Sequence, residues 1–391
     1  MTGRHPHSLP DPCDAMNESG DVSPSQARGF AARHLLAEDA RWVADIVWSS
    51  QDAGECQAYP ALLLGHHFVR IAYEGTKTLR SDTPDVGCPE LADLIRDQYA
   101  DITSRARHMS KLLDDTQKSD TDVLNEMRAA YNLCHQSLTG NARRGFRWLE
   151  TDLGLYLMQG RVVGASTPIA YRLGLDPSNP HVMGGESLTA VTHEWGGAMA
   201  VLASADLEPP REHGTLTLGN CGITYKDKLT SRYLARSYEP DFPVELKLFL
   251  LMIEADLNAN RLYLPLTEHG HEGSTFRARA VTVYHSLTAL RRVLNANPSV
   301  DTARTRTIRA FLDSAATQRL LSPAGKHVRN RSVHYEIPNP TIRPDFAQPM
   351  LGLVEAVNPG TTFVEFNTDV QGVSDQLSQL LSDWRHGSRS T

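Results

Sequence analysis

Six residues near the C-terminal end, from Arg329 to His334, carry side chains that can act together on a phosphodiester. The guanidinium of Arg329 can hold phosphate oxygens through two parallel hydrogen bonds, and it stays charged at physiological pH. The imidazole of His334 can take up and release a proton near neutral pH. Asn330 directly follows the arginine, and Arg331 adds a second cation. These residue types therefore predict phosphate binding combined with proton transfer.

The spacing of this pair does not identify a site by itself. With 32 arginines and 16 histidines in 391 residues, an Arg followed five positions later by a His is expected about once by chance. Slightly longer spacings also occur at Arg28–His34, Arg128–His135 and Arg279–His285. The prediction therefore depends on the elements that position the pair.

A single helix is predicted to carry the whole run. Ser322 can cap this helix, Pro323 suits its first position, and Pro338 is expected to end it. The helix thus begins and ends with recognised signals.

The helical geometry places the candidate residues at different angles. At 100° per residue, His334 lies about 40° from Asn330, about 60° from Arg331 and about 140° from Arg329. We expect the long Arg329 side chain to curl toward a cleft shared with His334. His327 lies seven residues before His334 on nearly the same face, so Arg331 and His327 are the predicted substrate-binding residues. The alternative is a solvated helix face for the arginines and a partly buried, hydrogen-bonded histidine.

Hydrophobic periodicity predicts a mainly α-helical chain with a small mixed section. We expect a disordered tail over 1–27, a helical domain over 28–160, a mixed connector or insertion over 161–240, and a helical bundle over 241–391. The mixed section is predicted to contain a β-hairpin, with Thr215–Leu218 and Cys221–Tyr225 on either side of Gly219-Asn220. The five helices expected in the C-terminal bundle are Leu246–Leu257, Phe276–Leu294, Ile308–Ala315 behind a cap at Asp301, the helix of the Arg–His run, and Val370–Trp384 behind Thr368 and Asp369.

The run Arg329-Asn330 followed by His334, on the next-to-last of five helices, resembles the signature of the HEPN family of ribonucleases. The resemblance covers residues 241–391 and implies a compact helical HEPN-like domain. It implies cleavage of single-stranded RNA by attack of the 2′-hydroxyl, with no metal or other cofactor. His334 would transfer protons, Arg329 would hold the phosphate, and Asn330 would orient one of them. It also implies a homodimer with the site across its two-fold axis, an antitoxin or regulatory partner, and a role in defence, toxicity or stress.

Composition limits the other classes of function. The net charge of −7 excludes a protein that coats nucleic acid through bulk positive charge, so any RNA contact must be local. The five cysteines form no CxxC pair, which argues against a zinc knuckle or a disulfide scaffold. The longest apolar run, Leu248–Ile253, is too short to span a bilayer, and the N-terminus does not resemble a signal peptide. We therefore expect a reduced, soluble, cytoplasmic protein without membrane contact.

Two other interpretations remain open. The HEPN-like domain can be a non-catalytic module that binds a nucleotide, RNA or a partner protein through the same cleft. Alternatively, a metal- or small-molecule-dependent enzyme can use the 160–275 region, where His193, His269 and His271 are the candidate ligands. The glycines Gly196 and Gly197 argue against a zincin-type helix after His193.

A basic patch precedes the mixed section. Arg143, Arg144 and Arg147 lie beside Phe146 and Trp148, a combination that can contact RNA or an acidic partner. A solvated helix face with buried aromatic rings is the more common outcome for such a pattern, and it is the one expected here.

Overall fold

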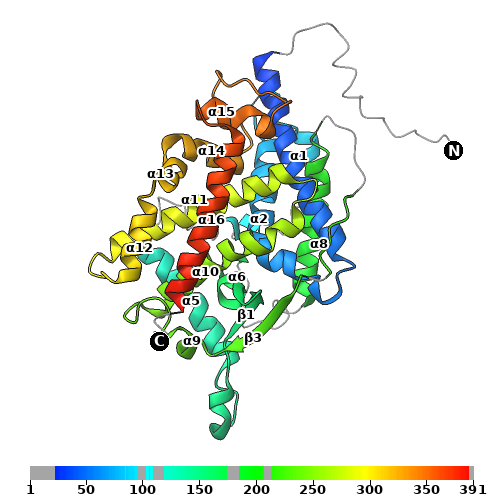
Figure 1. Ribbon diagram of the computed structural model, residues 1–391. Coiled ribbons are helices and arrows are strands. Elements are labelled where there is room, and N and C mark those ends of the chain that lie inside the picture. The colour runs from blue at the N-terminus through cyan, green and yellow to red at the C-terminus, as the bar shows by residue number, and fades with distance from the viewer. Residues whose placement is uncertain are drawn as a thin grey trace, which may run out of the picture.

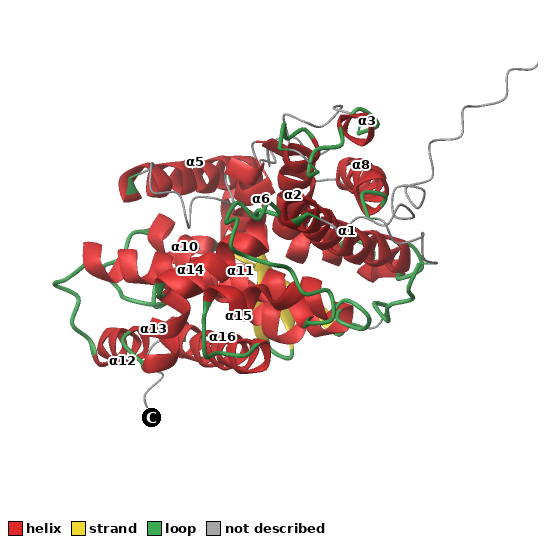
Figure 2. Cartoon of the chain, turned by 90° about the horizontal axis from the view of Figure 1, so that it is seen from above, coloured by secondary structure: helices red, strands yellow, loops and turns green. Residues whose placement is uncertain are grey.

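The computed structural model describes residues 23–83, 85–95, 103–104, 106–108, 119–173, 185–206, 213–219 and 221–386. The chain is mainly α-helical, as predicted, and its strands are confined to one small antiparallel sheet (Figures 1 and 2). Within the described residues, no helix is both long and apolar enough to cross a membrane.

The chain begins with the long helix α1 (Pro24–Ser50), which packs against α2 (Tyr59–Leu79). Ser23 and Gln26 start α1 with a reciprocal pair of side-chain to backbone hydrogen bonds. The predicted disordered tail is therefore wrong for residues 24–27, because this capping box makes them the first turn of α1. The rest of that predicted tail, up to residue 22, lies outside the described residues.

Helix α8 (Gly185–Ala203) lies along α1 and α2, although its two glycines argued against a helix. That expectation was wrong because tertiary packing outweighs the low helix propensity of glycine. A Cβ added to Gly196 would lie 3.5 Å from the side chain of Val47 in α1, which is ordinary van der Waals contact, and one added to Gly197 would lie in open space.

The sheet consists of β1 (Leu153–Met158), β2 (Arg161–Ala165) and β3 (Ile223–Lys228) in the order β2-β1-β3, all antiparallel. The hairpin joins β1 to β2 through Gln159 and Gly160, whose φ angles are +52° and +76°. Positive φ at both turn residues matches the twist of a two-residue hairpin.

The hairpin predicted over 215–225 is therefore wrong. Among the described residues of that segment, 215–218 form no strand, and β3 pairs with β1, where Met158 lies opposite Ile223. The reason is that Leu216 and Leu218 are buried against the body of the protein, and Ser49 of α1 accepts a hydrogen bond from the Leu216 backbone N–H.

The C-terminal half contains more helices than predicted. Thr302, not Asp301, caps α12, which ends at Leu312, so Ala315 opens a separate helix capped by Ser314. The bounds of the remaining elements, with those of α12, are η2 (Gly54–Cys56), α3 (Pro89–Ala92), α5 (Asp120–Leu138), η5 (Arg144–Leu149), α6 (Ser166–Leu173), α9 (Thr230–Leu234), α10 (Val244–Leu262), η6 (Leu264–Thr267), α11 (Glu272–Ala296), α12 (Ala303–Leu312), α13 (Ala315–Leu321), α14 (Pro323–Val333), η7 (Pro349–Gly352), α15 (Leu353–Val357) and α16 (Phe363–Arg385).

Helix boundaries follow the caps rather than the hydrophobic stripes. Ser322 caps α14 and Pro323 opens it, as predicted, but the helix ends at Val333, well before Pro338. The last helix, α16, begins at Phe363 because Thr362 caps it, about two turns before the predicted start at Val370.

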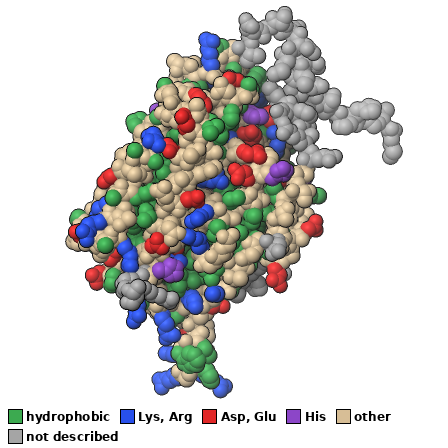
Figure 3. Space-filling model, viewed as in Figure 1, with side chains coloured by type: hydrophobic (Ala, Val, Ile, Leu, Met, Phe, Trp, Pro, Cys, Tyr) green, Lys and Arg blue, Asp and Glu red, His purple; other side chains and the backbone are tan. Residues whose placement is uncertain are grey.

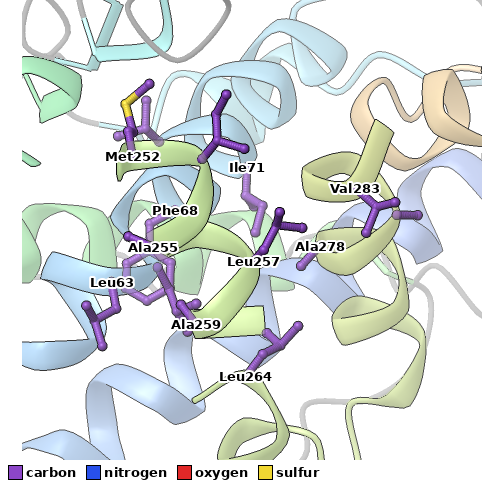
Figure 4. Close-up of a cluster of buried hydrophobic side chains, with 14 of the residues drawn as sticks. Leu63, Phe68, Ile71, Met252, Ala255, Leu257, Ala259, Leu264, Ala278 and Val283 are labelled. Carbon is purple, nitrogen blue, oxygen red and sulfur yellow. The ribbon is translucent and has the colours of Figure 1, made fainter. Parts of the chain in front are cut away.

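Helix α10 forms the centre of the core. Every residue from Glu245 to Asn260 is buried, and α10 contacts β2, α5, α11 and α16. Figure 4 shows Leu63 and Phe68 of α2 close to Leu257 of α10, with side chains of α11 nearby. One cluster of buried side chains runs from α1 to α16, while the domain boundaries at 160 and 240 stay a prediction.

Candidate functional site

The run from Arg329 to His334 lies at the C-terminal end of α14. His334 is the residue that follows the helix, and its backbone is extended, with φ −109° and ψ 125°. Two residues one turn apart on α2 hold this end. Arg70 donates a hydrogen bond from Nη1 to the Ser332 carbonyl at 2.6 Å, and the Glu74 carboxylate lies 2.9 Å from His334 Nδ1. Arg70 thus satisfies a carbonyl in the last turn of α14, and Glu74 fixes the position of the His334 imidazole.

Glu74 is a buried carboxylate that orients the histidine. One of its oxygens accepts hydrogen bonds from Arg107 Nε at 2.9 Å and Nη2 at 2.6 Å, and the other faces His334 Nδ1. Burial raises the pKa of Glu74, but the hydrogen bond from His334 and the charge of Arg107 outweigh it and hold the pKa at about 2. Glu74 is therefore ionised at every physiological pH. A carboxylate in this position fixes the ring and its tautomer.

The imidazole of His334 is accessible. Its side chain is 45% exposed, whereas that of Glu74 is 3% exposed. Within the described part of the chain, Nε2 has no hydrogen-bond partner, so this nitrogen is available to a ligand. This arrangement can perform general acid–base chemistry at the surface.

Arg329 points into the protein instead of toward His334. Its Nη2 lies 2.7 Å from His285 Nε2, its Nη1 donates to Asn330 Oδ1 at 2.9 Å, and its guanidinium lies 5.5 Å from the ring centre of Tyr284. The residue is 8% exposed, and burial followed by the charge of Arg107 lowers its pKa to about 10. The expected curl toward a shared cleft is not seen, because the 140° separation on the helix directs the side chain inward.

The other three residues of the sequence prediction lie close by. Asn330 orients Arg329 and not the histidine. Arg331 donates to the Glu336 carbonyl, and burial lowers its pKa. His327 is exposed on α14. The structure thus gathers these residues along α14 and at its C-terminal end, where the imidazoles of His327 and His334 are both accessible to solvent.

A cavity of about 540 Å³ is lined by residues that are neighbours of Glu74 and His334 in the chain, but not by these two residues themselves. Its lining includes Tyr73, which precedes Glu74, and Glu336, which follows His334 by two residues. Lys77 of α2 and Arg80, which directly follows α2, provide cations at its wall, and Trp195 of α8 provides an aromatic side chain. Asp82, Glu194 and Glu336 provide carboxylates at the same wall. A cavity of this size accommodates a nucleotide-sized ligand.

Guanidinium groups and neutral histidines fill the interior behind Glu74. Burial lowers the pKa of His285 to about 3, and it lowers the pKa values of His66 and His67 well below the ordinary value. Together with Arg70 and Arg107 these histidines line an internal cavity of about 20 Å³, which is room for a water molecule. These histidines are therefore neutral at physiological pH, and the positive charge of this interior is that of the arginines.

Sequence reasoning missed Glu74 and Arg107, the two residues that prepare His334. Glu74 lies 260 positions from His334, and no local motif marks either residue. The only available signal was the four-residue spacing of Arg70 and Glu74, which places both on one face of α2.

The 160–275 region contains a different arrangement. His271 Nε2 lies 3.0 Å from one oxygen of Asp45, and His213 Nδ1 lies 2.8 Å from the other. His269 is exposed, and the side chain of His193 lies outside the described residues. Over the ranges that the structure describes, no group of three or more His, Cys, Asp or Glu side chains is placed to hold a metal ion.

A second half-exposed histidine has the same type of partner as His334. His135 is 43% exposed, and its Nδ1 lies 2.6 Å from Asp152, which is fully buried. Asp152 also accepts hydrogen bonds from the backbone N–H and the hydroxyl of Thr230. The two carboxylates thus differ in their other partners. Asp152 contacts the hydroxyl and the backbone amide of Thr230, whereas Glu74 contacts the guanidinium of Arg107.

Comparisons with known proteins do not name a family. The chain matches no family model, no curated protein and no solved structure. The function must therefore be argued from the geometry of the site alone.

Proposed function

We propose that this protein is an endoribonuclease that cleaves single-stranded RNA through attack of the substrate's own 2′-hydroxyl. The observation that carries the proposal is the chain of contacts from Arg107 through Glu74 to His334, which ends in an imidazole that is 45% exposed. The nucleotide-sized cavity is lined by Tyr73 and Glu336, which lie one and two residues from Glu74 and His334 in the chain. The HEPN resemblance of the Arg329–His334 run supports the same activity.

In the proposed reaction the neutral imidazole of His334 takes the proton of the 2′-hydroxyl at Nε2. The 2′-oxygen forms a bond to the adjacent phosphorus while the bond from phosphorus to the 5′-oxygen breaks. A 2′,3′-cyclic phosphate forms, and the departing 5′-oxygen takes a proton from an acid. The Glu74 carboxylate stabilises the imidazolium formed in this step, and no external oxidant, reductant or metal ion is needed for the balance.

The guanidinium groups behind the site favour an anionic substrate, although the cavity wall also carries the carboxylates of Asp82, Glu194 and Glu336. Arg107 and Arg70 lie near enough to lower the pKa of Arg329, so three guanidinium groups share this region. Lys77 and Arg80 continue the positive charge along the cavity wall. We propose that the surface cations contact phosphate oxygens directly and that the buried Arg329 contributes through its charge.

The dimer implied by the HEPN resemblance belongs to the same proposal. A two-fold arrangement would bring a second His334 to the site, which would supply the acid that protonates the 5′-oxygen. The dimer is tested by measuring the mass of the protein in solution. A second test mixes two inactive variants with different catalytic defects, since a site shared between two chains would regain cleavage activity in the mixture.

The non-catalytic alternative is favoured by the burial of Arg329. Because this guanidinium is engaged by His285 and Asn330, it must break both contacts before it can hold a phosphate directly. A protein that binds RNA through the cavity without cleaving it would retain binding when His334 is replaced.

The decisive experiment measures cleavage of a labelled single-stranded RNA by purified protein in buffer containing EDTA. We expect cleavage by the wild type and by His135→Ala, and its loss in His334→Ala. His135→Ala is the matched control, because it removes an equally exposed histidine that pairs with a buried carboxylate. Cleavage that persists in His334→Ala, or disappears equally in both variants, contradicts the proposal.

A further inference from the structure

A short segment projects from the body of the protein between α5 and β1. This projecting tip, residues 139–150, includes η5 and extends beyond the neighbouring elements at the bottom of Figure 1. Three large apolar side chains on it are exposed to solvent, namely Phe146 (58%), Trp148 (65%) and Leu149 (56%). The expectation that these aromatic rings would be buried was therefore wrong, because the segment does not fold back onto the core.

The exposure is held in place by hydrogen bonds at the base of the tip. The Glu150 carboxylate accepts from the backbone N–H groups of Gly140 at 2.9 Å and Ala142 at 3.1 Å. Gly140 has a φ of +86°, which glycine adopts without strain. The single carboxylate next to the tip is thus used to close its base.

The 3₁₀ geometry of η5 sorts the side chains by type. In such a helix residues three apart lie on the same side, so Arg144 and Arg147 form one stripe and Phe146 and Leu149 form another. Trp148 occupies the third side. Figure 3 shows the hydrophobic surface at the end of the tip with cationic groups on both sides of it. One side of η5 therefore carries positive charge, and the other two sides carry large apolar side chains.

We propose that the projecting tip is a binding site for single-stranded RNA. Arg143, Arg144 and Arg147 bind phosphates along the strand, and bases stack on Phe146 and Trp148. The charge argues for this occupant, since three arginines occur within five residues of a chain whose net charge is −7. Stacking on aromatic rings between arginines is the usual mode of sequence-tolerant strand binding.

An anionic membrane surface fits the tip less well. Arg144 and Arg147 lie on the side of η5 next to the apolar sides, so deep insertion of the rings into lipid would bring two guanidinium groups to the hydrocarbon boundary. Along an RNA strand, the arginines on this side can contact phosphates while the rings beside them stack on bases. The arrangement is therefore better matched to phosphates and bases than to lipid.

The tip lies at the opposite end of the molecule from α14 in Figure 1. It would bind a part of the strand distant from the cleaved bond, and its contribution would be to affinity for long RNA and not to chemistry. This inference goes beyond the proposed ribonuclease activity, because binding at the tip does not require that His334 be catalytic.

The test is fluorescence anisotropy of a labelled 20-nucleotide single-stranded RNA with full-length protein carrying His334→Ala, which prevents cleavage. Adding Phe146→Ala with Trp148→Ala is expected to weaken binding at least tenfold, given the usual contribution of stacked bases. Adding Arg144→Gln with Arg147→Gln is expected to weaken binding and to reduce its salt dependence. Matched controls are Phe346→Ala, another half-exposed aromatic residue, and Arg306→Gln, another exposed arginine, and both should bind normally.

Tip variants that bind within twofold of their parent overturn the inference, as does an equal loss in Phe346→Ala. A second experiment measures co-sedimentation of the same variants with vesicles that contain phosphatidylserine. If the tip is needed for sedimentation with vesicles and RNA is not bound, the ligand of the tip is a membrane surface and the RNA inference is overturned. The two proposals fail separately. If RNA binding depends on the tip but the wild type does not cleave RNA, only the ribonuclease proposal is contradicted. If cleavage depends on His334 but the tip variants bind RNA normally, only the proposed tip site is contradicted.

Discussion

Replacing Glu74 with glutamine removes the charge that orients His334 while it keeps the size of the side chain. The fall of the Glu74 pKa from its ordinary value of 4.5 to about 2 corresponds to about 3 kcal/mol of stabilisation. Because the pKa is lower in the folded protein, this stabilisation is present in full above pH 4.5 and is lost as the pH falls toward 2. The side chain is 3% exposed, so solvent screens little of this energy.

We therefore expect Glu74→Gln to lower the free energy of unfolding by about 3 kcal/mol at pH 7, with a gap to the wild type that narrows below pH 4.5. Urea denaturation at pH 7, 4 and 3 measures this gap. RNA cleavage at pH 7 should fall by about 100-fold, since the imidazole loses its orientation and the stabilisation of its charged form.

Asp152→Asn is the matched control, because Asp152 is a buried carboxylate paired with the half-exposed His135. It should destabilise the fold and leave cleavage unchanged per folded molecule. An equal loss of cleavage in both variants would mean that activity follows stability alone. A stability gap for Glu74→Gln that stays constant from pH 7 to 3 would refute the electrostatic account of its pKa.

Three further substitutions test the packing that positions the site. Asp39→Asn should destabilise the protein by about 3–5 kcal/mol in urea, because this buried carboxylate holds both Arg70 and Arg277 and they would keep their charge. Leu257→Ala should cost about 2–5 kcal/mol in the same assay, since Leu257 is fully buried in the central helix α10. Gly160→Ala should cost about 1–2 kcal/mol, because φ is +76° there, and the melting temperature should fall without loss of far-UV circular dichroism.

Local signals were sufficient for parts of the site. Ser322 caps α14 and Pro323 opens it, because a hydroxyl that satisfies free N–H groups and a ring that presets φ act within one turn. The 140° angle between Arg329 and His334 also follows from helical geometry, and it explains why the guanidinium points inward. The expected curl failed because the interior offers His285 and Asn330 as partners.

Non-local contacts decided what the local signals could not. The predicted hairpin over 215–225 had a suitable Gly-Asn step, but Ile223–Lys228 pairs with a strand some 70 residues earlier. The aromatic residues Phe146 and Trp148 look like core residues in the sequence, but a carboxylate at Glu150 holds their segment away from the body.

The sequence by itself determined the mainly helical class, the capped start of α14 and the presence of an arginine and a histidine at its end. These features depend on interactions within a few residues, whose energies are set by residue type and spacing. Only the tertiary structure decided that His334 is half-exposed with Glu74 behind it, while Arg329 is buried. The partners of His334 come from segments more than 200 residues away, and their approach depends on how α2 packs against α14.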